Sequence, residues 1–117
     1  MRNKSDENWK VVALCLQYET LNAAASRLYY AVFQAVLAYA IAKKGYIRDP
    51  DVSVHIKMSS YVRDTPDGKF YERVYKLLII SRTTADYEPE TPPDPRIGSL
   101  YKDSGSMRQY FFNLAES

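Results

Sequence analysis

One long stretch, residues 22–42, restricts the fold more than any other part of this chain. It reads NAAASRLYYAVFQAVLAYAIA and is followed by two lysines and a glycine. On a wheel of about 100° per residue, apolar side chains fill two opposite sides of this stretch. One side holds Leu21, Ala24, Leu28, Val32, Ala35, Val36 and Tyr39, and the other holds Ala23, Tyr30, Phe33, Leu37 and Ile41. A helix that is apolar on both sides is expected at the centre of a helical bundle.

A polar strip interrupts the apolar surface of this predicted helix. Arg27, Tyr30 and Gln34 fall within an arc of roughly 60°. Such a strip has two explanations that the sequence leaves open. It is either a polar network that fixes how the helices pack, or one wall of a cleft that binds a ligand.

Length and composition predict a single domain. A chain of 117 residues buries roughly two thirds of its unfolded surface, which is enough for one core. The formal net charge of +2 neither requires nor excludes an RNA partner. Cys15 is the only cysteine, so no internal disulfide forms, and neither a secretion signal nor a membrane segment is expected. We therefore expect one domain over residues 1–117 in the cytoplasm.

Apolar spacing predicts an all-α, up-and-down bundle of four to five helices. Ser5 is the expected N-cap of the first helix, and Gly45 the left-handed C-cap of the central one. A proline-rich connector is expected over residues 88–105. The helices are expected at about Asp6–Tyr18, at residues 22–42, at Val54–Arg63, from Lys69 to about Asp86, and from Ser106 onward.

Three blocks of sequence resemble the HEPN family of prokaryotic proteins. Residues 26–35, SRLYYAVFQA, are similar to that family's Ser-Arg-x-Tyr-Tyr-Ala-x-Phe-His-Ala signature. A basic, histidine-containing segment follows at residues 53–57, SVHIK, and residues 82–87, RTTADY, match an Arg-x-x-Ala-Asp-Tyr block. The resemblance spans residues 21–87 and implies a helical bundle that often dimerises through its long helices.

The resemblance also implies an association with RNA or nucleotides. HEPN proteins include metal-independent endoribonucleases, toxins whose antitoxin is a minimal nucleotidyltransferase, and non-catalytic members. The ribonucleases carry an Arg-x4-6-His motif on the later helix. Here no histidine follows Arg82, where Asp86 and Tyr87 stand, and Gln34 occupies the histidine position of the signature. Gln34 cannot transfer protons as histidine does, which argues against ribonuclease activity.

The candidate nucleotide- or RNA-binding residues are Arg27, Tyr30, Gln34, Arg82 and Asp86. Arg82 can hold a phosphate bidentately, or it can pair with Asp86 one turn away. Burying an arginine unpaired is costly, and for Arg27 the expected partner is Asp86. The same five residues therefore suit either a buried network or a nucleotide cleft.

Three further residues are candidates for nucleotide or RNA binding: His55, Lys57 and Tyr87. A lone histidine at a helix start is more often a cap or surface residue. No cofactor, metal site or catalytic residue is predicted.

These patterns lead to one functional expectation and two alternatives. We expect a nucleotide- or RNA-associated module that forms a homodimer and works with a separate nucleotidyltransferase in a toxin–antitoxin or defence system. The first alternative is a divergent endoribonuclease that uses Arg82 with Asp86 or His55. The second is a structural dimerisation module without a ligand.

Overall fold

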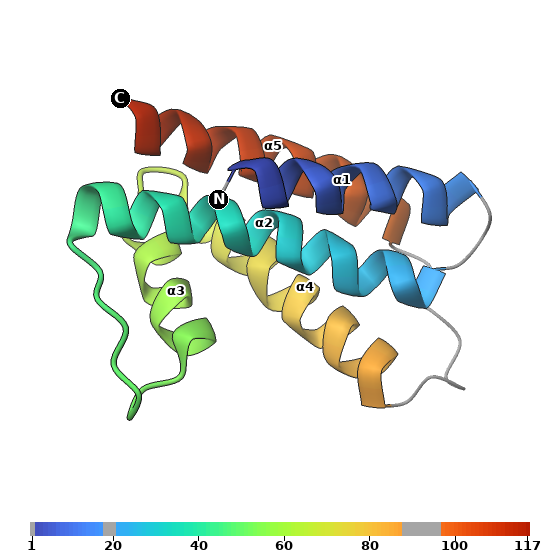
Figure 1. Ribbon diagram of the computed structural model, residues 1–117, viewed down its shortest axis with the longest axis horizontal. Coiled ribbons are helices and arrows are strands. Elements are labelled where there is room, and N and C mark those ends of the chain that lie inside the picture. Colours follow the sequence, from blue (N-terminus) through green and yellow to red (C-terminus); the bar gives the residue numbers. More distant parts are fainter. Residues whose placement is uncertain (1, 18–20, 88–96) are drawn as a thin grey trace.

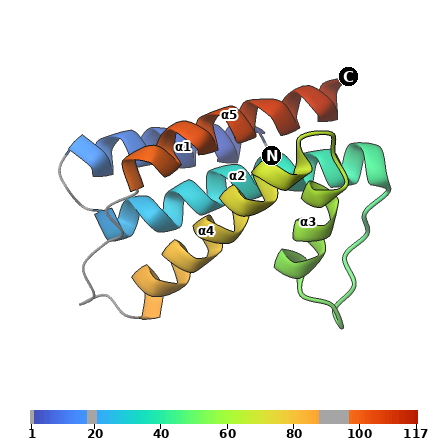
Figure 2. The ribbon, with the colours of Figure 1, turned by 180° about the vertical axis from the view of Figure 1, so that it is seen from behind.

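The computed structural model describes residues 2–17, 21–87 and 97–117. Within these ranges the chain is an all-α bundle without strands, as the sequence predicts. Its helices are α1 (Arg2–Gln17), α2 (Leu21–Lys44), α3 (Val54–Arg63), α4 (Gly68–Tyr87) and α5 (Ile97–Glu116). Figures 1 and 2 show α1 and α5 on one side of α2, with α3 and α4 on the other. None of the described helices is long and apolar enough to cross a membrane.

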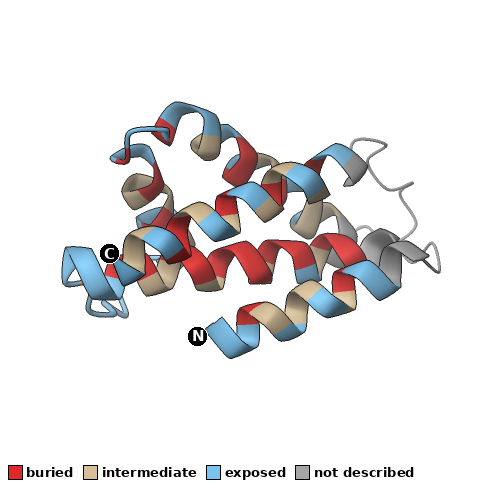
Figure 3. Ribbon diagram, turned by 90° about the horizontal axis from the view of Figure 1, so that it is seen from above, coloured by how far each residue is buried: buried red, intermediate tan, exposed pale blue. Residues whose placement is uncertain are grey.

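Helix α2 lies at the centre of the bundle and packs against each of the other four helices. Figure 3 shows a nearly continuous series of buried residues along it. Leu28, Val32 and Val36 are at most 1% exposed, so the first apolar side forms the core as predicted. The largest fully buried partners from other helices are Met58, Tyr75, Leu78, Met107 and Phe111.

The second apolar side of α2 is only partly covered, which corrects the prediction of burial on both sides. Phe33 is buried, whereas Tyr30 and Leu37 are half-buried and Ile41 is 47% exposed. The short helix α3 reaches only part of this side. These residues form an apolar wall that is partly open to solvent.

The end of α2 confirms the predicted capping. Lys43 and Lys44 lie in the last turn, where their charges favour the helix dipole. Gly45 has a φ of 63°, in the left-handed region that glycine adopts without steric cost. The backbone N–H of Tyr46 then donates to the carbonyl of Ala40 at 3.1 Å, which closes the helix end.

The beginning of α1 differs from the prediction. The helix starts at Arg2, so Ser5 lies inside it and is not its N-cap. Ser5 is fully buried, and its hydroxyl donates to the carbonyl of Ala31 on α2 at 2.7 Å. The same hydroxyl accepts a hydrogen bond from Nε of Arg108 on α5 at 2.7 Å. A serine in this pattern looks like a cap in sequence, but here it joins three helices.

Helix α5 also starts earlier than expected, at Ile97, so residues 97–105 are helical and do not belong to the predicted connector. The remainder of that connector, residues 88–96, lies outside the described residues, as do residues 19–20 between the first two predicted helices. Gly105 sits inside α5 because a side chain there would crowd α1. An added Cβ would lie 3.1 Å from a ring carbon of Trp9. The glycine signals close helix packing at this point, where the sequence suggested a helix start.

Replacing Ser5 with alanine should lower the free energy of unfolding by about 1–3 kcal/mol, because Arg108 Nε would then be left without its buried acceptor. The matched control is Ser106→Ala, whose exposed hydroxyl donates to the Lys102 carbonyl of the same helix. Urea unfolding followed by circular dichroism measures both. Equal stability of Ser5→Ala and Ser106→Ala would contradict a structural role for the Ser5 hydroxyl.

Candidate functional site

A buried tyrosine hydroxyl joins three helices at the side of α2 that faces α3 and α4. Tyr29 on α2 is fully buried, and its hydroxyl forms a hydrogen bond with Nδ1 of His55 on α3. The hydroxyl of Tyr75 on α4, also fully buried, lies 3.4 Å from the Tyr29 hydroxyl. Because a buried hydroxyl needs a partner, this chain of contacts fixes the imidazole of His55.

Arg82 on α4 lies against the same tyrosines. Its guanidinium carbon is 5.3 Å from the ring centre of Tyr29 and 5.2 Å from that of Tyr30. Both distances are within the range of cation–π attraction. We call Tyr29, Tyr30, Phe33, His55, Tyr75 and Arg82 the tyrosine–histidine cluster.

Burial in the cluster changes the acid–base properties of several members; it raises the pKa of the Tyr75 hydroxyl, and it also acts on Tyr29 and His55. Burial raises the pKa of Tyr29 to about 12, so this hydroxyl keeps its proton at neutral pH. Burial, and secondly the positive charge of Arg82, lower the pKa of His55 below its ordinary value of 6.5. His55 is therefore neutral at pH 7, with one ring nitrogen bearing hydrogen and the other able to accept it.

A groove of about 480 Å³ opens beside the cluster, between α2, α3 and the loop that joins them. We call it the aromatic groove. Its walls are mainly apolar, and the polar groups that reach it belong to a tyrosine pair, a histidine and an arginine. The lining residues are Tyr30, Phe33, Leu37, Ile41, Tyr46, Arg48, Val54 and His55. Since Tyr29 engages Nδ1 of His55, Nε2 is the ring nitrogen that remains for a ligand in this groove.

The structure brings together three of the predicted site residues and separates a fourth. Tyr30, His55 and Arg82 belong to the tyrosine–histidine cluster. Arg27 is exposed and donates from Nη1 to Oδ1 of Asn8 on α1 at 3.1 Å, so it contacts a different helix. Gln34 is half-buried on the same strip of α2 and does not line the aromatic groove.

The remaining candidates have different outcomes. Lys57 is exposed, and its ammonium lies 5.3 Å from the ring centre of Tyr61, beside a second hollow that His55 does not line. The side chains of Asp86 and Tyr87 lie outside the described residues, so the expected pairing of Arg27 with Asp86 is not tested.

Tyr29 belongs to the tyrosine–histidine cluster, although it is not among the site residues that the sequence predicts. It is in the core, but its hydroxyl is at the polar edge of that core. The consecutive tyrosines at 29 and 30 were the available signal, since both precede Phe33 by helical spacing. Tyr46 and Arg48 gave no signal, because only the course of the loop after Gly45 brings them to the groove.

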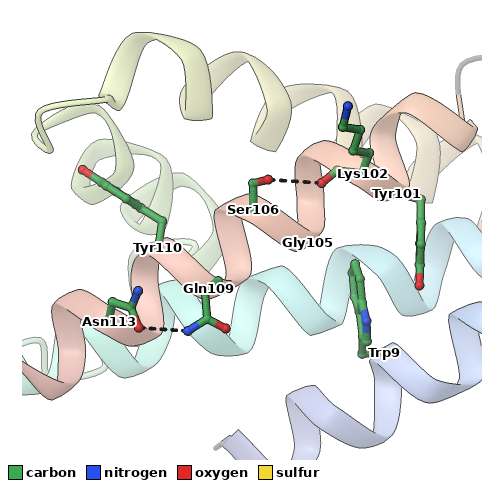
Figure 4. A pocket seen from close by; sticks show the side chains of 8 residues that line it. All are labelled: Trp9, Tyr101, Lys102, Gly105, Ser106, Gln109, Tyr110 and Asn113. Carbon is green, nitrogen blue, oxygen red and sulfur yellow. Dashed lines mark hydrogen bonds between the residues drawn. The ribbon is translucent and has the colours of Figure 1, made fainter.

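A different hollow, of about 660 Å³, lies between α1 and α5 (Figure 4). Trp9 stacks on Tyr101 with ring centres 4.6 Å apart, so these two rings face each other. The amide of Gln109 donates to Asn113 within α5. The residues that line this hollow include neither an imidazole nor a guanidinium. The aromatic groove is therefore the better candidate, because both His55 and Arg48 line it together with apolar side chains.

The donor set of the site suits an organic anion better than a metal ion. Within the described ranges, no three His, Cys, Asp or Glu side chains are grouped closely enough to hold a metal. The groove offers stacking surfaces, one imidazole and one guanidinium, which are groups that bind aromatic rings and phosphates.

Comparison of the chain with protein-family models, with curated proteins and with solved structures finds no match. The chemistry of the site is therefore the basis for assigning a function.

The imidazole of His55 should titrate below pH 6.5, and Arg82→Gln should raise its pKa by removing a nearby positive charge. NMR titration of the imidazole Cε1–H measures this directly, because His55 is the only histidine. The lowered pKa also makes folding stability fall as the pH drops from 6.5 through the folded-state pKa.

The matched control for this titration is Arg73→Gln, which removes an exposed cation from the same helix. It should leave the His55 pKa unchanged. An identical pKa in Arg82→Gln and in the wild type would contradict the electrostatic contact between Arg82 and His55.

Proposed function

We propose that this chain is a nucleotide- or RNA-associated module of the HEPN type, and that the aromatic groove holds a nucleotide base with its phosphate. The observation that carries the proposal is that Tyr30, Phe33, His55 and Arg48 line one groove. A base stacks on aromatic side chains, and a phosphate accepts hydrogen bonds from imidazole N–H and guanidinium groups.

The dimensions of the groove support this ligand class. Its volume of about 480 Å³ falls in the range of small-molecule sites, which are mostly apolar with a few polar groups that orient the ligand. Stacking of a base on an aromatic side chain contributes about 1–3 kcal/mol and accepts any base. We therefore expect weak sequence preference and a requirement for phosphate.

Contacts within the tyrosine–histidine cluster hold two side chains of the groove, His55 and Tyr30, in position. Tyr29 holds Nδ1 of His55, and Arg82 lies over the rings of Tyr29 and Tyr30. These contacts restrict the rotation of the two groove residues, His55 and Tyr30, before any ligand binds. A site prepared in this way loses less conformational entropy on binding.

Two partners belong to the proposal through the family resemblance alone. They are a second copy of the chain and a separate nucleotidyltransferase, both in the cytoplasm. Exposed apolar side chains near the groove, including Ile41, Ile47 and Ile56, are compatible with a protein partner there.

A second candidate function is metal-independent cleavage of RNA. It is favoured by the position of Arg82, which lies close enough to His55 to lower its pKa although the two are far apart in sequence. A neutral His55 would take the proton from a 2′-hydroxyl as its oxygen bonds to phosphorus and the bond to the 5′-oxygen breaks. The positive charge of Arg82 would stabilise the transition state. Binding remains our preferred proposal, because the described residues that line the groove include no second imidazole and no carboxyl group to protonate the leaving oxygen.

Binding of the 5′-phosphorylated dinucleotide pApA, measured by calorimetry at low salt, tests the proposal. We expect saturable binding, and we expect Arg48→Gln and His55→Gln each to weaken it about tenfold by removing a charged or hydrogen-bonding contact to phosphate. The matched control is Arg73→Gln, an exposed cation on α4 that does not line the groove.

The absence of pApA binding to the wild type, or equal weakening by the control variant, would contradict the proposal. Incubation of a labelled RNA without metal distinguishes the second candidate. If the wild type produces fragments that end in a 2′,3′-cyclic phosphate and Arg82→Gln does not, RNA cleavage is the function in place of binding.

A further inference from the structure

A second groove, between α1 and α2, gathers positive charge. It has a volume of about 500 Å³ and is lined by Lys4, Glu7, Asn8, Lys10, Val11 and Arg27. Three of these side chains are cationic and one is a carboxylate, while the whole chain has a formal net charge of only +2. We call this surface the basic groove. The positive charge concentrated in this groove favours a ligand with negatively charged groups.

The arginine of the basic groove is held in position. Nη1 of Arg27 donates to Oδ1 of Asn8 at 3.1 Å. The amide nitrogen of Asn8 in turn donates to the carbonyl of Lys4 at 3.0 Å. The bond to Asn8 uses one of the five N–H donors of the guanidinium and orients the others. An oriented guanidinium matches the geometry of phosphate oxygens.

The basic groove and the aromatic groove are each lined in part by α2, at positions three residues apart. Arg27 lines the first and Tyr30 lines the second. Residues three apart on a helix have Cβ atoms about 5–6 Å from each other. Two residues of the polar strip, Arg27 and Tyr30, therefore line different grooves one turn apart on α2.

We propose that the basic groove binds the phosphate backbone of a single-stranded polynucleotide whose adjoining base occupies the aromatic groove. This inference rests on the proposed function and extends it from a nucleotide to a strand. A ligand with alternating bases and phosphates contacts both surfaces, and a short one reaches only the aromatic groove. Proteins that bind single strands commonly combine a cationic groove with aromatic stacking surfaces.

Fluorescence anisotropy with labelled RNA of about eight nucleotides, compared with calorimetry on pApA, tests the inference. The double variant Lys10→Gln with Arg27→Gln should bind the longer RNA about tenfold more weakly and pApA unchanged. The slope of log K against log salt should also become shallower by about 0.7 for each phosphate that the variant no longer neutralises. The matched control is Lys69→Gln with Arg73→Gln, which removes two exposed cations from α4.

The inference is overturned if the wild-type protein does not bind the longer RNA at low salt, or if the double variant binds it with unchanged affinity and salt slope. It is also overturned if inorganic polyphosphate displaces the labelled RNA as effectively as unlabelled RNA does. Failure of the proposed function looks different. In that case pApA does not bind, while the longer RNA still binds in a manner that depends on Lys10 and Arg27. That result keeps the basic groove as a strand-binding surface and removes the aromatic groove from it.

Discussion

The hydrogen bond between the buried hydroxyl of Tyr29 and the imidazole of His55 is the contact on which the proposed site depends. A buried hydroxyl without a partner is costly, so Tyr29 requires a polar group from a neighbouring helix. That requirement places α3 against α2 with His55 at the contact, and α4 supplies Tyr75 and Arg82 to the same place. One polar contact thus links the packing of three helices to the position of an imidazole beside a groove.

The same packing explains why one side of α2 remains partly open. Helices α1, α4 and α5 all pack along α2, and Leu28, Val32 and Val36 of α2 are at most 1% exposed. The short α3 then covers only part of the opposite side, and the loop from Gly45 to Ser53 supplies the remaining wall. A helix that is apolar on both sides therefore forms core on one side and a wall of the aromatic groove on the other.

The sequence predicts the helical class and most helix positions, because apolar spacing and Gly45 are local signals. It fails where the deciding partner is distant in sequence. Ser5 lies at a typical N-cap position in the sequence, although its hydrogen bonds with Ala31 and Arg108 account for its burial. Gly105 lies where the sequence predicts a helix start, although the close approach of Trp9 accounts for the glycine. For the site, the sequence identifies Arg82 and His55 only separately. Their proximity, and the separation of Arg27 from them, follow from how the helices pack.

A crystal structure of the chain with bound pApA examines the central claim most directly. The account predicts a base against Tyr30 and Phe33 and a phosphate oxygen within hydrogen-bond distance of His55 Nε2 or the Arg48 guanidinium. The Tyr29 hydroxyl should still engage Nδ1. A dinucleotide bound elsewhere, or His55 turned away from Tyr29 with its ring outside the groove, would contradict the account.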